Sequence, residues 1–299
     1  MARKTSLPGM LDAVEREAVE FLREHEPPEG YQLCFSGGKD SIVMRNLADI
    51  ASVKYTALFN CTTIDPPEMY RFIRREYPDT VWHFPKRNFF ERLTVKGPAW
   101  RKVRWCCQEL KESGNISGLS AIMIGIRAEE SRQRAERRRI EPARKKKGLT
   151  YYAPIHGWKE WQIWEHIEKW GLPYPSLYDE GYHRIGCKLC PMTFGPSPAA
   201  QARLEREKAR YPHFVRRFEE ALRIWFEKDT ARRKEQGVKI WHEDFNDFLR
   251  SYYDDMERCD HCMARFRAGG CDRWGTESPP CEQSDYDEEE DEDEADGDE

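Results

Sequence analysis

A phosphate-binding turn is predicted at Ser36-Gly37-Gly38-Lys39-Asp40-Ser41. The two glycines let the backbone turn tightly, so that its N–H groups and the positive end of a helix dipole point toward one anion. Lys39 adds a positive charge, and the serine hydroxyl groups add hydrogen-bond donors. The turn follows the apolar residues 33–35 and precedes apolar residues at helical spacing, which places it between a strand and a helix. An ordinary strand-to-helix turn that contains Gly-Gly is the alternative.

A second charged segment, Gly125 to Arg132, follows the apolar residues 121–124. Arginine suits phosphate because its planar fork of N–H donors matches two phosphate oxygens. Ligands of a parallel sheet bind beyond the carboxyl ends of its strands, where we expect the turn, Thr63 and Arg127 to emerge together. We therefore predict that Arg127 and Arg132 neutralise phosphate charge. A solvated, ion-paired face is the alternative for both.

Four of the ten cysteines form two pairs, Cys106-Cys107 and Cys187-x-x-Cys190, with 79 residues between the pairs. Four thiolates hold either a [4Fe-4S] cluster or zinc. Zinc knuckles usually separate the cysteines of a pair by about two to four residues. The adjacent cysteines therefore favour the cluster and leave zinc as the alternative.

A second cysteine set lies within 23 residues and consists of Cys259, Cys262, Cys271 and Cys281. This compactness predicts a small zinc knuckle that folds around its metal. Free thiols are the alternative.

The formal net charge of −5 hides two opposed charge runs. Residues 282–299 carry 13 acidic side chains and no basic one, and without them the net charge is +8. Between Arg132 and Lys147, nine basic residues accompany two acidic ones. This basic run is compatible with nucleic acid or another polyanion, and a solvated loop is the alternative.

The elements that must position these residues alternate between strand and helix. We predict helices over 11–25, 67–76 and 161–170, and strands over 33–35, 53–59, 81–84 and 121–126. This alternation predicts an α/β fold with a doubly wound parallel sheet.

Four regions follow from these patterns: a nucleotide-binding catalytic domain (1–198), a helical extension (199–256), a Cys-rich metal-binding knuckle (257–281) and a disordered acidic tail (282–299). The apolar stretches are too short to span a membrane, and Met1 to Lys4 are not followed by the apolar core of a signal peptide. We expect a cytoplasmic protein with no membrane partner. In a reducing compartment its cysteines serve as ligands or thiols rather than as disulfides.

The Ser36 to Ser41 turn resembles the PP-loop of ATP pyrophosphatases. Gly125 to Arg132 is similar to the G-x-R-x-x-E-S-R stretch of the phosphoadenosine phosphosulfate (PAPS) reductase branch, which also holds a subunit of sulfate adenylyltransferase. The blocks 62–68, 106–111 and 186–191 resemble PAPS-reductase-like proteins of phages and prophages. The two cysteine pairs resemble the arrangement with which adenylylsulfate (APS) reductases bind a [4Fe-4S] cluster.

This resemblance covers residues 30–195 and implies that ATP binds with its phosphates on the turn and is cleaved between the α and β phosphates. Lys39 would neutralise charge as pyrophosphate leaves, and Asp40 would hold Mg²⁺ or orient the loop. The resemblance also implies nucleotide contacts at Thr63, Asp65 and Gly125.

The first hypothesis for function is an ATP-dependent enzyme that adenylates an oxygen for sulfur insertion, with nucleic acid as candidate substrate and a sulfur-donor protein as partner. It resembles the ATP pyrophosphatases of DNA phosphorothioation. The runner-up is a PAPS or APS reductase, but the chain lacks the Glu-Cys-Gly-x-His segment of those enzymes, which also usually degrade the PP-loop. A sulfate adenylyltransferase subunit and a nucleic-acid-binding module with a vestigial loop are further alternatives.

Overall fold

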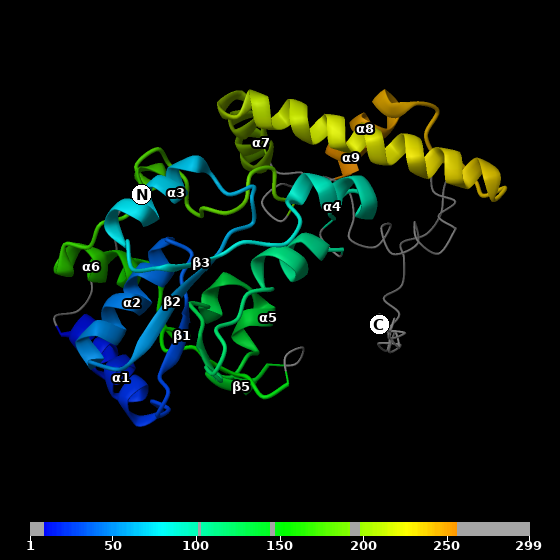
Figure 1. Ribbon diagram of the computed structural model, residues 1–299. Coiled ribbons are helices and arrows are strands. Elements are labelled where there is room, and N and C mark those ends of the chain that lie inside the picture. Colours follow the sequence, from blue (N-terminus) through cyan, green and yellow to red (C-terminus); the bar gives the residue numbers. More distant parts are fainter. Residues whose placement is uncertain (1–8, 101–102, 144–146, 192–197, 256–299) are drawn as a thin grey trace, which may run out of the picture. The chain divides into compact units, whose positions relative to one another are not determined.

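The structure is a computed structural model that describes residues 9–100, 103–143, 147–191 and 198–255. Within these ranges six strands form one sheet in the order β3-β2-β1-β4-β6-β5 (Figure 1). The strands are β1 (Tyr31–Cys34), β2 (Tyr55–Asn60), β3 (Val81–His83), β4 (Ala121–Met123), β5 (Ile140–Pro142) and β6 (Thr150–Tyr152). Strands β3, β2, β1, β4 and β6 run parallel, and β5 is antiparallel to β6. The prediction of an α/β fold is confirmed, with a mostly parallel sheet.

The first hydrophobic cluster joins the sheet to four helices: α1 (Met10–Glu24), α2 (Lys39–Ala51), α3 (Pro67–Glu76) and α6 (Glu160–Trp170). Strand β1 lies near the middle of the sheet and is largely buried, as apolar parallel strands are when helices cover them. Its buried amide side chain, Gln32, accepts the backbone N–H of Ile116 at 2.7 Å. This bond offsets the cost of burying the amide.

The second hydrophobic cluster joins α4 (Phe89–Lys96) to the C-terminal helices α7 (Pro198–Arg210), α8 (Pro212–Glu235) and α9 (Phe245–Asp255). The long helix α8 lies across α4 (Figure 1). Phe89 stacks on Phe218 with ring centroids 6.1 Å apart, and Phe218 packs on Tyr252. In the described part of the chain, the predicted extension therefore shares a core with residues that precede the cysteine pairs.

Short elements place the residues of chemical interest. Cys107–Lys111 form the π-helix η1, Ala128–Glu130 the 3₁₀ helix η2, Arg132–Ala135 the one-turn helix α5, and Ser176–Tyr178 the 3₁₀ helix η3. The strand predicted over 121–126 ends at Met123. In the described part of the chain, no helix is both long and apolar enough to cross a membrane.

Candidate functional site

The Ser36 to Ser41 turn connects β1 to α2. Gly37 has a φ of 70°, and a Cβ there would lie 2.9 Å from side-chain atoms of α3, so this position requires glycine. The Ser41 hydroxyl group donates to the carbonyl oxygen of Gly38 at 2.8 Å and accepts the N–H of Ser36 at 3.3 Å. The Ser41 side chain thus ties the two ends of the turn together.

Lys39 is the first residue of α2, and its side chain is only 4% exposed. Its Nζ donates to the carbonyl oxygen of His183 at 2.8 Å and lies 3.2 Å from Glu160 Oε1. Its backbone N–H donates to the hydroxyl oxygen of Tyr178 at 3.0 Å. These three neighbours were missed by sequence reasoning because they lie far along the chain and belong to no phosphate-binding motif.

Arg127 reaches the turn through Asp40. Its side chain is 4% exposed, its Nε donates to Asp40 Oδ1 at 2.6 Å, and its guanidinium group also pairs with Glu129. A Cβ on Gly125 would lie 3.5 Å from the backbone of Asp40, so the chain after β4 passes close to the start of α2. The structure therefore brings Lys39, Asp40, Gly125 and Arg127 together at the carboxyl ends of β1 and β4.

Arg132 is not brought to the turn. Its side chain is 94% exposed, and its Nε donates to Glu136 at 3.1 Å, which corresponds to the solvated, ion-paired alternative. Three more arginines of the basic run are paired with acidic groups: Arg134 with Glu130, Arg137 with Glu141 and Arg139 with Glu17. These pairs reduce the positive charge that the described part of the run offers a polyanion.

Thr63 and Asp65 lie in the turn after β2 and face α4 and the cysteines. Thr63 has a φ of 66°, and its hydroxyl oxygen accepts the N–H of Phe89 at 2.9 Å. Asp65 accepts the hydroxyl proton of Tyr70 at 3.1 Å, and its Oδ1 lies 3.9 Å from the Sγ of Cys187. Burial raises the pKa of Asp65 above its ordinary value. Within the protein, Thr63 thus contacts α4, and Asp65 contacts Tyr70 and Cys187. Nucleotide binding by these two residues stays a prediction.

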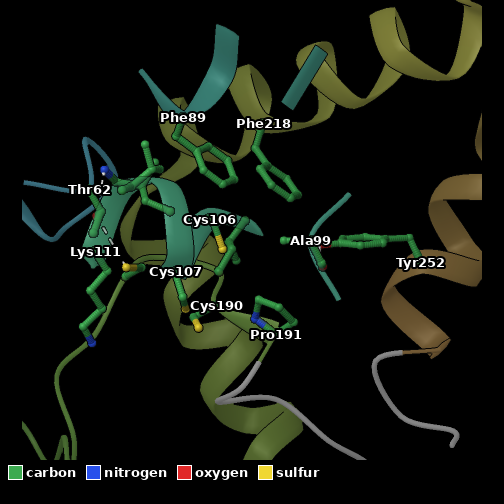
Figure 2. A pocket seen from close by; sticks show the side chains of 14 residues that line it. Thr62, Phe89, Ala99, Cys106, Cys107, Lys111, Cys190, Pro191, Phe218 and Tyr252 are labelled. Carbon is green, nitrogen blue, oxygen red and sulfur yellow. Dashed lines mark hydrogen bonds between the residues drawn. The ribbon is translucent and has the colours of Figure 1, made fainter. Parts of the chain in front are cut away.

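The four cysteines Cys106, Cys107, Cys187 and Cys190 line one pocket (Figure 2). One pair lies at the start of η1 and the other in the loop after η3. The space between the lining side chains measures about 420 Å³, with its open mouth included. The other walls are mainly apolar and include Ile64, Phe89, Leu110, Phe218 and Tyr252. Of these, Phe218 and Tyr252 come from α8 and α9.

The thiol groups of Cys106 and Cys107 interact through a hydrogen bond. A hydrogen bond from Cys106 lowers the pKa of Cys107 to about 6, and the same bond together with burial raises the pKa of Cys106. Among the described residues, no three His, Cys, Asp or Glu side chains are placed to hold a single metal ion. The second set, Cys259, Cys262, Cys271 and Cys281, lies outside the described residues.

Comparison with known proteins places these residues in a family. The phosphoadenosine phosphosulfate reductase domain matches residues 31–193, more than half of the chain. The chain belongs to this family. The matched residues include the turn and both cysteine pairs, whereas Phe218 and Tyr252 lie beyond them.

Two relatives are similar to large parts of this chain. An uncharacterized protein of Methanocaldococcus jannaschii is 29% identical over 234 residues, which are 74% of this chain and 47% of that protein. The adenosine 5'-phosphosulfate reductase of Lysinibacillus sphaericus is 29% identical over 199 residues, which are 60% of this chain and 82% of that enzyme. The chain thus spans about half the length of the first relative, and a second M. jannaschii protein is covered over 58%.

Two solved structures are also similar. The PAPS reductase of Candida auris has 19% identity and a TM-score of 0.46, and the match covers 62% of this chain and 98% of that enzyme. The FMN adenylyltransferase of Candida glabrata has 15% identity and a TM-score of 0.43, with 62% of this chain and 66% of that enzyme covered.

Proposed function

We propose that this protein binds ATP on the Ser36 to Ser41 turn and cleaves it between the α and β phosphates. The observation that carries this proposal is the buried cation of Lys39 at the start of α2, with Arg127 held beside it by Asp40. A triphosphate would bring negative charge to the start of a helix, where it would compete with the carboxylates of Asp40, Glu129 and Glu160 for the two cations.

In the proposed reaction, an acceptor oxygen attacks the α phosphorus and forms a new O–P bond. The bond from the α phosphorus to the bridging oxygen breaks, and pyrophosphate leaves with its electron pair. Lys39 and Arg127 stabilise the charge that develops on the leaving group. The terminal sulfur of a thiocarboxylate on a donor protein then attacks the adenylated acceptor atom, and AMP leaves with the electron pair of the broken acceptor–oxygen bond. Hydrolysis of the remaining acyl–sulfur bond releases the thiolated acceptor and the carboxylate form of the donor.

Asp40 is assigned to orienting the turn rather than to binding Mg²⁺. Its Oδ1 is bonded to Arg127, and its Oδ2 lies 4.0 Å from the Nζ of Lys39, so both carboxylate oxygens face cations. The Mg²⁺ that would accompany ATP is therefore not assigned to this carboxylate.

The cysteine pocket is proposed to hold a [4Fe-4S] cluster. Its chemistry fits: four thiol groups face one largely apolar space, and each cysteine of such a cluster binds a different iron, so the four need not converge on one ion. A bound cluster would supply one-electron chemistry. Zinc at this pocket and a zinc knuckle at Cys259 to Cys281 are the metal alternatives.

Nucleic acid is proposed as the acceptor. Its support is the basic run, in which Arg132 and Arg138 remain exposed. The ion pairs at Arg134, Arg137 and Arg139 weaken this support relative to the sequence alone.

Sulfonucleotide reduction is the second candidate, because adenosine 5'-phosphosulfate reductases are among the relatives. In that reaction a thiol would take the sulfonate from the nucleotide and release AMP or its 3'-phosphorylated form, and a second thiol would then release sulfite and form a disulfide.

One experiment separates the candidates. Full-length protein is purified anaerobically and incubated with ATP labelled in the α phosphate, with and without DNA or tRNA, and in parallel with APS or PAPS and a dithiol. Release of AMP and pyrophosphate, or transfer of labelled AMP to nucleic acid, supports the proposal. Sulfite release from APS or PAPS without any ATP cleavage would replace it with the reductase.

A further inference from the structure

Tyr178 lies over the phosphate-binding turn, although 139 positions separate it from Lys39 in the chain. Its hydroxyl oxygen accepts the backbone N–H of Lys39 at 3.0 Å. A Cβ built on Gly38 would lie 3.4 Å from the same oxygen, so the hydroxyl group is within contact distance of the Gly-Gly backbone. The Tyr178 hydroxyl group therefore lies at the position where the turn would bind an anion.

A tyrosine hydroxyl group both accepts and donates a hydrogen bond. Here its lone pair takes the Lys39 N–H, and in the described part of the chain its own proton has no acceptor. Burial raises the pKa of Tyr178, so the phenol keeps that proton at neutral pH.

We infer that Tyr178 is a phosphate-binding residue whose hydroxyl group donates a hydrogen bond to an oxygen of the pyrophosphate part of ATP. This inference rests on the proposed function and adds to the turn a donor from outside the Ser36 to Ser41 motif. The hydroxyl group lies between the N-terminus of α2 and the ligand: it accepts a hydrogen bond from the first N–H of α2 and donates one to the ligand.

The donor is held in place before a ligand arrives. The Tyr178 ring packs edge-on against Trp164 of α6, with centroids 5.1 Å apart and planes at 85°. Two residues later, Glu180 forms an ion pair with Arg210 of α7, which also pairs with Glu68 of α3. Three helices thus fix the segment, and a donor fixed in advance loses little entropy when it binds.

The test compares Tyr178→Phe with Tyr174→Phe in the full-length protein. Tyr174 is a matched control because its ring packs edge-on against the same Trp164, with centroids 5.4 Å apart, while its hydroxyl group donates to Asp179. Calorimetry measures the Kd for ATP, inorganic pyrophosphate and AMP. We expect Tyr178→Phe to raise the Kd for ATP and pyrophosphate about fivefold, with AMP unchanged and Tyr174→Phe equal to wild type.

The outcomes separate this inference from the function on which it rests. If the wild type binds neither ATP nor pyrophosphate, the proposed function fails and the inference fails with it. If the wild type binds both and Tyr178→Phe binds them equally well or more tightly, only the inference fails. Tighter binding would mean that the hydroxyl group competes with phosphate for the Lys39 N–H. An equal loss for AMP would overturn the assignment to pyrophosphate.

Discussion

Lys39 is the residue whose loss should affect nucleotide binding most directly. Its ammonium group is buried beside the turn, and a charge-assisted bond to phosphate contributes about 1.5–3 kcal/mol. We expect Lys39→Ala to raise the Kd for ATP about 10- to 100-fold, measured by calorimetry. Lys54→Ala is the control because, within the described residues, the Lys54 Nζ donates only to the exposed carbonyl oxygen of Pro28, at 3.4 Å. An unchanged Kd in Lys39→Ala would argue against phosphate binding at the turn.

Cys190 tests the nature of the cysteine pocket. A four-iron cluster that lacks one thiolate is easily lost, so Cys190→Ser should remove the brown colour and most of the iron from anaerobically purified protein. Iron and sulfide analysis checks this, with Cys34→Ser as the control because Cys34 does not line the pocket. Zinc without iron in the wild type, even after anaerobic reconstitution, would overturn the cluster assignment.

At the residue scale, the positions of some site residues could be predicted from the sequence, because the local backbone or the topology of the sheet determines them. The glycines allow the tight turn of the backbone. Lys39, Asp40 and Arg127 follow the neighbouring strands β1 and β4, so they lie at the same edge of the sheet. The direction of Arg132 could not be predicted, because the short elements η2 and α5 turn the chain toward solvent. Tyr178 could not be predicted either, since only tertiary packing brings it to the turn.

Among the elements, α1, α2 and α6 meet at the buried His166. Its Nδ1 lies 2.6 Å from Glu15 Oε1 of α1 and its Nε2 lies 2.8 Å from the side-chain amide group of Asn46 of α2. A neutral ring has one N–H, which it donates from Nδ1 to the carboxylate, and its Nε2 then accepts a hydrogen bond from the amide NH₂ group. Burial lowers the pKa of His166, and this effect outweighs the opposing attraction of Glu15; Lys169 lowers the pKa further. There is therefore a pH range in which the His166 ring is neutral in the folded protein but protonated in the unfolded chain.

This difference predicts how stability depends on pH. Because the pKa is lower in the folded state, the contribution of His166 is complete above pH 6.5, the ordinary pKa, and is lost as the pH falls toward the folded value. We expect the free energy of unfolding in urea to fall between pH 7.5 and 5.5 more steeply for the wild type than for His166→Gln. Equal slopes for the two proteins would show that the ring does not titrate in this way.

At the scale of elements, the long or fully buried segments were predictable and the short ones were not. Strands β1 and β2 and helices α1 and α3 follow from continuous apolar or periodic patterns. Strands β5 and β6 have three residues each and carry polar side chains, so that the pairing of β6 with β4 and of β5 with β6, rather than an apolar pattern, defines them. The antiparallel edge of the sheet was missed for this reason.

For the whole molecule, the packing of α8 on α4 predicts one cooperative unit rather than a domain with an appendage. Phe218 is 2% exposed, so Phe218→Ala should cost about 3–5 kcal/mol of stability. The control is Ile224→Ala on the same helix, where the side chain is 38% exposed and the cost should be below about 1 kcal/mol. Urea unfolding should show one transition by both tryptophan fluorescence and circular dichroism. Two separate transitions would show instead that the helical extension predicted over residues 199–256 unfolds independently.

The segment from Tyr178 to Cys190 contacts both sites. Near its start, Tyr178 and His183 hold Lys39, and near its end Cys187 and Cys190 line the cysteine pocket. Between these ends, the carbonyl oxygen of Arg184 accepts a hydrogen bond from Arg203 of α7. A shift of the whole segment would therefore move groups at both sites. If a group bound by the cysteines changes the affinity for nucleotide by some factor, then nucleotide must change the affinity of the cysteines for that group by the same factor.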